Sequence, residues 1–350
     1  MSSSRTDTDT NDIANGLSNC ITKDGQQTLT ANIPFSGFKI TGLGPGAAPT
    51  DAATIQNVLN LAGARVCDFR LTLTAGVAVT TADVTGATTV FCSPYKGNAI
   101  SLFDGVGTWN TRYSAEFSIA LGTLTANIPY DVFCYDNASV PTLEILAWTN
   151  DSARATPLAL QNGVYVKTGA TTRRYLGTFR TTSTTQTEDS LLNRYLWNYY
   201  NRIPRFLIGQ NAGAPSWTYT TNTVRQANAA TTAQVSFVIG VNEDAQRFTL
   251  ATSSSNTNAS VGMAAGLGFD STTQFYSYST SPVSMSAVAN AAIVHNATLY
   301  LNPGFTSAGR HFVTWLEISQ ATGTTTWYAS ATVGGVVTSN NYGITGIILA

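Results

Sequence analysis

The chain has 350 residues, of which 18 are Lys or Arg and 19 are Asp or Glu, and its formal net charge is −1. This balance leaves no basic surface for the phosphates of a nucleic acid or an anionic membrane, so we expect neither partner. No stretch approaches the ~20 consecutive apolar residues of a membrane-spanning helix, and the first residues lack the apolar run of a signal peptide, so we expect no membrane insertion and no export signal.

Hydrophobic residues make up 43% of the chain, whereas charged residues make up only 11%, far below the usual level of about a quarter. Thr, Ser, Asn and Gly take their place, and this mixture favours strands joined by tight turns. A charge-poor surface also suits contacts between identical subunits, because few ions have to be desolvated. We therefore expect an all-β chain that associates with itself.

The N-terminal part is predicted to be an extended arm. Residues 1–23 are polar and could not bury enough apolar surface to fold alone. Residues 24–40 contain two extended pieces, and residues 51–61 form the best helix candidate, with Thr50 or Asp51 as the N-cap. The predicted first domain is thus an arm over residues 1–62 with one short helix.

From Arg65 onward the hydrophobic pattern alternates with a period of two. In Cys67–Thr74 the odd positions are apolar and the even ones polar, as in a half-buried strand. Further strands are predicted at Thr89–Ser93, Ala99–Phe103, Tyr130–Tyr135, Thr142–Trp148, Gly163–Lys167 and Arg174–Thr181. Short strands separated by turn residues are typical of sandwiches and barrels, so we predict a middle β-sandwich over residues 63–208.

The C-terminal part repeats this pattern. Residues 187–207 are ambiguous, and we interpret them as an extended connector, followed by a linker at residues 209–215. Later strands are predicted at Ala233–Ile239, Gln246–Ala251, Gln274–Ser279, Ala297–Leu301, His311–Ile318, Thr324–Ala329 and Gly343–Leu349. We predict a second β-sandwich of jelly-roll size over residues 209–350.

The four cysteines show no metal-binding or redox spacing. They are Cys20, Cys67, Cys92 and Cys134. The last three lie inside strand-like runs, where a free cysteine behaves as a small buried hydrophobe. We therefore expect structural thiols rather than disulfides or metal ligands.

His295 and His311 are the only histidines, and neither has a second His or Cys at metal-ligand spacing. We expect no metal and no cofactor. On a strand, His311, Trp315 and Glu317 would share one face, which we interpret as a cross-strand polar pair or a subunit contact.

Motifs for catalysis are absent from the sequence. There is no nucleophile elbow, phosphate loop or dinucleotide fingerprint. A glycosidase would need two carboxylates about 5–10 Å apart, and Glu116, Glu144 and Glu317 lie on predicted strands that could pair. The sequence leaves such a site open but does not point to one, so we predict that the chain is not an enzyme.

Several segments resemble virion proteins of tailed bacteriophages. The run Ala31–Gly44 (ANIPFSGFKITGLG), followed by Ala52–Thr54, resembles the N-terminal segment of tailed-phage fibre proteins. Other segments that resemble phage virion proteins are Val90–Asn98, Leu146–Asn150, Arg173–Phe179, Gly268–Thr273 and Trp315–Glu317. Long fibres often continue into coiled-coil or β-helical shafts, but this chain has neither heptads nor shaft repeats.

The resemblance implies a short, globular fibre or appendage. The chain would be part of the virion, assembled in the cytoplasm of the bacterial host, as a homotrimer that contacts tail, neck or capsid proteins. Its distal domain would attach to a host surface glycan or an outer-membrane receptor. A capsid decoration or head-fibre protein is the main alternative, and a surface-polysaccharide hydrolase is a third.

Two groups of residues are the expected contact sites. The particle anchors would be apolar residues of the arm, namely Ile33, Phe35, Phe38 and Ile40. The receptor-facing residues would lie on two polar loops at 253–258 and 339–342, since loops on a rigid scaffold tolerate variation. These residues are Asn256, Asn258, Asn340, Asn341 and Tyr342.

Overall fold

The structure is a computed structural model, and its chain divides into two compact units, Met1–Thr54 and Ile55–Ala350. It describes residues 8–13, 41, 42, 44, 63–210, 213–277, 283–285, 288–303, 306–333, 336–339 and 342–350. In the first unit, residues 8–13 are helical and exposed. The helix predicted at residues 51–61 and the four predicted anchors (Ile33, Phe35, Phe38 and Ile40) lie outside the described residues.

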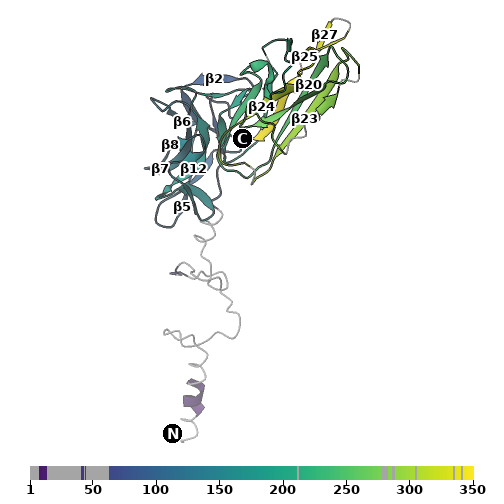
Figure 1. Ribbon diagram of the computed structural model, residues 1–350. Helices are drawn as coiled ribbons and strands as arrows, with labels where there is room; N and C mark the ends of the chain where they lie inside the picture. The colour runs from purple at the N-terminus through teal and green to yellow at the C-terminus, as the bar shows by residue number, and fades with distance from the viewer. Residues whose placement is uncertain are drawn as a thin grey trace. The chain divides into compact units, whose positions relative to one another are not determined.

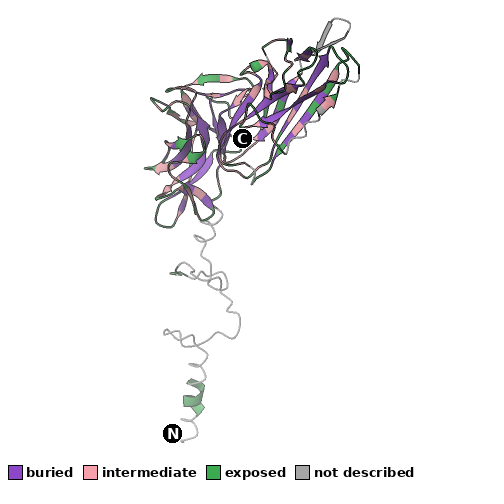
Figure 2. Cartoon of the chain, in the orientation of Figure 1, coloured by how far each residue is buried: buried purple, intermediate pink, exposed green. Residues whose placement is uncertain are grey.

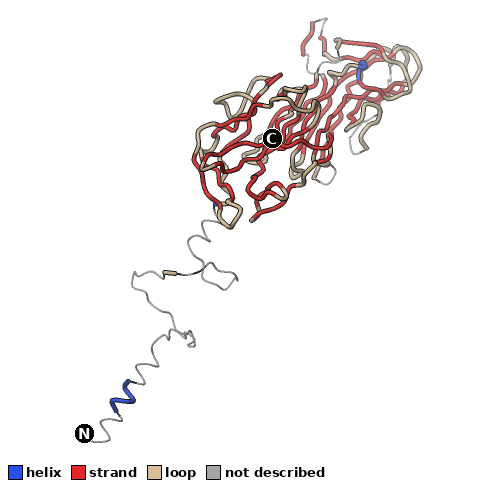
Figure 3. The backbone as a smooth tube through the Cα atoms, turned by 90° about the vertical axis from the view of Figure 1, so that its left-hand side faces the viewer, coloured by secondary structure: helices blue, strands red, loops and turns tan. Residues whose placement is uncertain are grey.

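The second unit is built almost entirely from strands, which confirms the predicted all-β class (Figures 1 and 3). Up to residue 209 the strands are β1 (Phe69–Thr72), β2 (Val84–Ala87), β3 (Thr89–Pro94), β4 (Ala99–Phe103), β5 (Trp109–Tyr113), β6 (Phe117–Ala120), β7 (Pro129–Asn137), β8 (Val140–Asn150), β9 (Ala153–Arg154), β10 (Leu158–Gln161), β11 (Val164–Lys167), β12 (Ala170–Arg180), β13 (Thr187–Asp189), β14 (Asn193–Arg194), β15 (Leu196–Asn198) and β16 (Pro204–Gly209).

The remaining strands are β17 (Ser216–Thr218), β18 (Arg225–Gln226), β19 (Gln234–Ile239), β20 (Gln246–Asn256), β21 (Gly262–Phe269), β22 (Val283–Met285), β23 (Ile293–Leu301), β24 (Gly309–Ser319), β25 (Thr325–Tyr328), β26 (Ala331–Val333), β27 (Val336–Ser339) and β28 (Gly343–Leu349). A single 3-10 turn, η1 (Ala227–Ala229), interrupts them among the described residues. No described helix is long and apolar enough to cross a membrane.

A seven-stranded sheet dominates the part before residue 200. Its order is β10-β11-β12-β7-β8-β9, and β15 pairs with β12 off this path. The β10–β11 hairpin turns at Asn162 and Gly163, whose φ values are 52° and 78°, as expected for an Asn-Gly turn. A three-stranded sheet, β1-β3-β6, contributes to the same core, in which Phe69, Val132 and Phe179 are buried.

The hairpins β4-β5 and β26-β27 form two-stranded sheets, and two larger sheets complete the described part of the unit. One has eight strands in the order β2-β13-β14-β19-β24-β21-β22, with β18 pairing β24, and the other has six in the order β16-β28-β20-β25-β17, with β23 pairing β20. Their inward residues, among them Val235, Phe248, Leu299 and Trp315, form the larger core. Figure 2 shows much of these strands buried. β19 and β21 are buried almost throughout, whereas β23 alternates between buried and more exposed residues, the pattern of a strand with one solvated face.

Both the sheets and the larger core cross the predicted boundary at residues 208 and 209. β14 pairs in parallel with β19, and β16 pairs along its whole length with β28. Phe133, Tyr175 and Trp197 also belong to the larger core. A fragment that started at residue 210 would therefore lose a strand of the six-stranded sheet and part of the core.

Most of the strand predictions are confirmed, but one predicted strand and one predicted loop are wrong. The predicted strand at 274–279 is not one over its described part, since residues 271–277 form bends and a turn. The predicted polar loop at 253–258 is strand β20 as far as Asn256. Its polar side chains are compatible with a strand because their hydrogen bonds are made inside the sheet.

Candidate functional site

The residues predicted to face a receptor occupy different environments. Asn256 is fully buried, and its amide nitrogen donates to Thr325 Oγ1 at 2.7 Å and to the Thr322 carbonyl at 2.9 Å. Asn258 is exposed after the end of β20, and Tyr342 is half-buried before β28. Asn340 and Asn341 lie outside the described residues. The structure therefore gives Asn256 a structural position rather than a place on a loop.

His311 on β24 holds a loop in place. Its Nδ1 lies 2.8 Å from Asp270 Oδ2, and its Nε2 lies 2.8 Å from the Ser307 carbonyl. Both partner atoms are oxygens that accept hydrogen bonds. His311 thus makes the predicted polar pair and fixes the backbone of Ser307.

Glu317 on the same strand is fully buried and accepts three hydrogen bonds. The donors are Trp217 Nε1 at 2.7 Å, Arg225 Nε at 2.8 Å and the Asn228 backbone nitrogen at 3.2 Å. Burial raises the pKa of Glu317 to about 7, although Trp217 and Arg225 oppose the shift. This carboxylate ties β17, β18 and η1 to β24.

Ser254 and His295 form a buried pair whose geometry superficially resembles a nucleophile and its base. Ser254 Oγ lies 2.7 Å from His295 Nε2, but both residues are 0% exposed. His295 Nδ1 has no partner among the described residues, so no acid orients the ring. A nucleophile–base pair needs substrate access and an orienting group, and this pair has neither.

The cysteines and the remaining strand carboxylates occupy structural positions. Cys67, Cys92 and Cys134 are free and buried, and burial raises their pKa values, the opposite of a reactive thiolate. Glu144 forms ion pairs with Lys167 at 2.5 Å and Arg173 at 3.0 Å. Burial raises the pKa of Glu144, but the two cations outweigh it and the net pKa is lowered. Within the described part of the chain, no group of three or more His, Cys, Asp or Glu could hold a metal ion.

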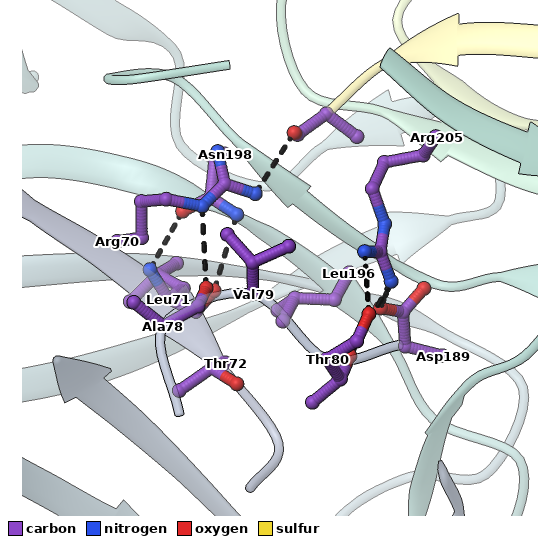
Figure 4. A pocket seen from close by; sticks show the side chains of 11 residues that line it. Arg70, Leu71, Thr72, Ala78, Val79, Thr80, Asp189, Leu196, Asn198 and Arg205 are labelled. Carbon is purple, nitrogen blue, oxygen red and sulfur yellow. Dashed lines mark hydrogen bonds and ion pairs between the residues drawn. The ribbon is translucent and has the colours of Figure 1, made fainter. Parts of the chain in front are cut away.

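A buried polar junction joins distant parts of the unit (Figure 4). Arg205 donates to Asp189 at 2.7 Å and to the Thr80 carbonyl at 2.8 Å, and Arg194 donates to the other Asp189 oxygen at 3.1 Å. Arg70, which is 4% exposed, donates to the carbonyls of Ala78, Asn201 and Ala350. The space left here is only about 10 Å³, no more than one water occupies. We assign this junction a structural role.

A larger cleft of about 380 Å³ lies where three segments meet. One wall comes from β8 to β11 and includes Ser152, Leu158 and Tyr165, and the other comes from residues 240–242 and 307–308. Its volume falls in the range of about 300–1,000 Å³ that is typical of small-molecule sites.

A hydrogen-bonded network centred on Arg154 links the two walls of the cleft. Arg154 donates to Asp131 at 2.7 and 3.1 Å and to the Gly240 carbonyl at 2.6 Å, and its guanidinium stacks 4.3 Å from the Trp148 ring. Asp131 is 1% exposed and also accepts from Thr178 Oγ1 at 2.7 Å. Because these charges are paired and hydrogen-bonded, the network can hold both walls in fixed positions.

The opposing walls are also connected by direct contacts. Arg310 donates its backbone N–H to the Asp151 carbonyl at 2.8 Å, and the Asp151 side chain accepts from Arg180 at 2.7 Å. Sequence reasoning missed this cleft, because its residues come from separate segments between Trp148 and Ala308 and carry no motif.

Comparison with known proteins gives no family for the chain. No protein-family model and no curated protein matches it. Among solved structures, a Cry1Da tryptic core variant from Bacillus thuringiensis aligns at 8% identity over 84% of this chain and 54% of that chain, with a TM-score of 0.18. The infectious bursal disease virus Gx strain structure aligns at 10% identity over 77% of this chain and 73% of that chain, also with a TM-score of 0.18.

The mosquito-larvicidal Cry4Aa toxin from Bacillus thuringiensis aligns at 8% identity over 78% of this chain and 50% of that chain, with a TM-score of 0.17. The chain therefore spans about half the length of the two toxin chains. At these TM-scores the likenesses carry no argument about fold or function.

Proposed function

We propose that the chain is a structural component of a tailed-phage particle, of the short-fibre or appendage type. The observation that carries the proposal is the resemblance of Ala31–Gly44 and Ala52–Thr54 to the N-terminal segment of tailed-phage fibre proteins. In such a component the N-terminal segment docks on the particle and the β-rich part is presented outward.

The character of the second unit supports this proposal. Its described residues form three hydrophobic clusters and several interlocked sheets, and charged residues make up only 11% of the whole chain. A scaffold of this kind presents binding surfaces without needing a catalytic centre. Several copies on one particle would bind a host surface by avidity, since tethering raises the effective concentration of each further contact.

Labelled electron microscopy of particles tests the proposal. An antibody raised against the full chain should label a tail, neck or appendage structure at fixed positions. Label on the capsid shell would replace the fibre assignment with capsid decoration. Particles that carry the protein in no position would refute a virion role.

Deletion of residues 1–60 tests the docking part of the proposal. We expect the shortened chain to fold, because the described sheets begin at β1, and to be missing from assembled particles. A second, narrower variant replaces the four proposed anchors with Ser in the full-length chain, namely Ile33, Phe35, Phe38 and Ile40, and should also be missing from particles. Normal incorporation of both variants would place the anchor elsewhere in the chain.

A further inference from the structure

We propose that the cleft between β8–β11 and residues 240–242 and 307–308 binds an uncharged saccharide unit. The biological source of that saccharide, a host surface glycan, rests on the proposed function, whereas the binding itself does not. Four properties of the cleft support the proposal, namely its charge, its lining, its rigidity and its place in the fold.

The cleft has no free charge. Arg154 is the only charged residue among the described residues that line it, and Asp131 receives two hydrogen bonds from its guanidinium. A charged ligand would lose its hydration here without gaining a counter-ion, which is costly. An uncharged ligand does not meet this penalty.

The lining combines apolar rings and aliphatic surface with small polar groups. Tyr165 and Leu158 are half-buried and Pro157 is exposed, so a ligand can contact them. Ser307 contributes a hydroxyl group from the opposite wall, whereas the Ser152 hydroxyl already donates to Asn150 Oδ1 at 3.1 Å. A sugar ring offers the matching surfaces, since it has an apolar C–H face and hydroxyl groups around its edge. A purely apolar ligand would cover the Ser307 hydroxyl without offering it a hydrogen bond, which is costly.

The walls are rigid, so little ordering has to accompany binding. Thr306 makes two hydrogen bonds with the Asn242 side chain. The Asn242 amide nitrogen donates to the Thr306 carbonyl, and Thr306 Oγ1 donates to Asn242 Oδ1 at 2.8 Å. Gly240 has no room for a side chain, because a Cβ there would lie 2.0 Å from the Tyr175 hydroxyl and 2.5 Å from the Trp197 ring. A preformed site avoids the entropy cost that weakens binding by mobile loops.

The cleft lies where the two halves of the unit meet. β8–β11 belong to the seven-stranded sheet, whereas residues 240 and 308 flank β19 and β24 of the eight-stranded sheet. Ligand sites occur preferentially at such junctions. His311 contributes as a positioning residue, because its Nε2 hydrogen bond holds the Ser307 carbonyl.

Saturation-transfer NMR on the full-length protein tests the proposal. The probes are the methyl glycosides of glucose, galactose, mannose and N-acetylglucosamine at millimolar concentration, with methyl glucuronide as a charged probe. We expect transfer to at least one neutral glycoside and weaker transfer to the glucuronide. Transfer to none of the neutral probes, or a preference for the glucuronide, would overturn the inference.

Four variants locate the binding. Ser307→Trp fills the cleft from an exposed position, and Tyr165→Leu removes the ring, so each should weaken binding about tenfold, or about 1.4 kcal/mol. Tyr165→Phe keeps the ring and should bind normally. Ser118→Trp, on an exposed position of β6, is the matched control for added bulk. Binding that survives both Ser307→Trp and Tyr165→Leu would place the sugar outside this cleft.

The two proposals can fail independently. Sugar binding by the purified chain with no antibody label on particles would refute the virion assignment alone. Particle labelling together with an absence of binding to every neutral glycoside would refute the cleft assignment alone.

Discussion

Two buried side chains of the second unit, His295 and Glu317, respond to pH in opposite directions. Burial lowers the pKa of His295 to about 4 and raises that of Glu317 to about 7. The imidazole is kept neutral and resists protonation, and the carboxyl resists ionisation. Each shift is linked to folding stability over the same acidic range, so the two contributions partly cancel in the native chain.

The His295 shift predicts a loss of stability in acid. Because its folded-state pKa lies below the unfolded value of 6.5, the unfolded chain binds more protons as pH falls from about 6.5 to 4. The contribution present above pH 6.5 is therefore lost in that window, by roughly 3 kcal/mol. His295→Gln has no imidazole to protonate and should not show this loss. As pH falls from 7 to 4.5, the wild type should therefore lose its advantage, and the urea-unfolding free energies of the two proteins should converge. A constant difference across this range would contradict the prediction.

The Glu317 shift predicts the opposite slope. Its folded-state pKa lies above the unfolded value of 4.5, so the stability present below pH 4.5 is lost as pH rises to about 7. As pH rises from 4.5 to 7.5, the urea-unfolding free energy of Glu317→Gln should therefore increase relative to that of the wild type. If the variant instead falls further behind, the hydrogen bonds from Trp217 and Arg225 outweigh the burial of the carboxylate.

Residue chemistry also shows where sequence reasoning succeeds and where it does not. The three strand cysteines were expected to be buried structural thiols, and they are. The polar run Ser253–Asn256 was interpreted as loop because its residues are hydrophilic, yet all four are buried. Partners such as Tyr328, Thr325 and His295 satisfy these groups. Such partners are distant in the chain, so local composition cannot reveal them.

Among the elements, β21 was missed for a related reason. Its sequence, GMAAGLGF, has no β-branched residue and little polar alternation, so it lacks the usual strand signal. The structure pairs it with β24 over seven residues, and a Cβ at Gly268 would lie 2.4 Å from the Ser271 carbonyl. Small residues are needed here because other backbone approaches closely. By contrast, β4 and β28 have the predicted bounds, since their own apolar residues define them.

The junction at Asp189 predicts a large effect from a small change. This carboxylate pairs with Arg194 and Arg205 from β14 and β16, and all three residues are at most 9% exposed. Asp189→Asn would leave two buried guanidinium groups without a counter-ion, at a cost of about 3–5 kcal/mol. Urea unfolding, monitored by tryptophan fluorescence, measures this loss in the free energy of unfolding.

Glu243→Gln is the matched control for that measurement. Its pair with Arg202 is more exposed, at 36% and 20% for the two side chains, so the expected loss is below about 1 kcal/mol. Equal losses in the two variants would show that burial does not determine the strength of these pairs.

At the scale of the whole molecule, strand content was predictable and connectivity was not. Alternating patterns and Asn-Gly turns define hairpins locally, and the β10–β11 hairpin follows from them. The pairings β14–β19 and β16–β28 join segments up to about 140 residues apart, and no local pattern encodes such contacts. The cleft shares this property, because its two walls meet only after the sheets have formed.

One face of the six-stranded sheet is a candidate contact between identical subunits. Phe206, Ile347, Arg247 and Tyr300 stand opposite one another on β16, β28, β20 and β23. Phe206 is 59% and Tyr300 is 55% exposed, and Arg247 stacks 5.4 Å from the Tyr300 ring. A flat row with one cation and large apolar groups is suited to association with little ion desolvation.

The fibre proposal predicts a trimer, so light scattering on the purified full-length chain should give three times the 37.0 kDa of one chain. Phe206→Asp places an unpaired charge on the row and should shift the equilibrium toward monomer, because burying that charge is costly. Val106→Asp, at a position that is 92% exposed in the β4–β5 loop, is the control and should leave the trimer intact. A trimer that survives Phe206→Asp would show that the subunits contact each other through another face. A wild-type monomer at micromolar concentration would count against the fibre proposal, because avidity requires several copies held together.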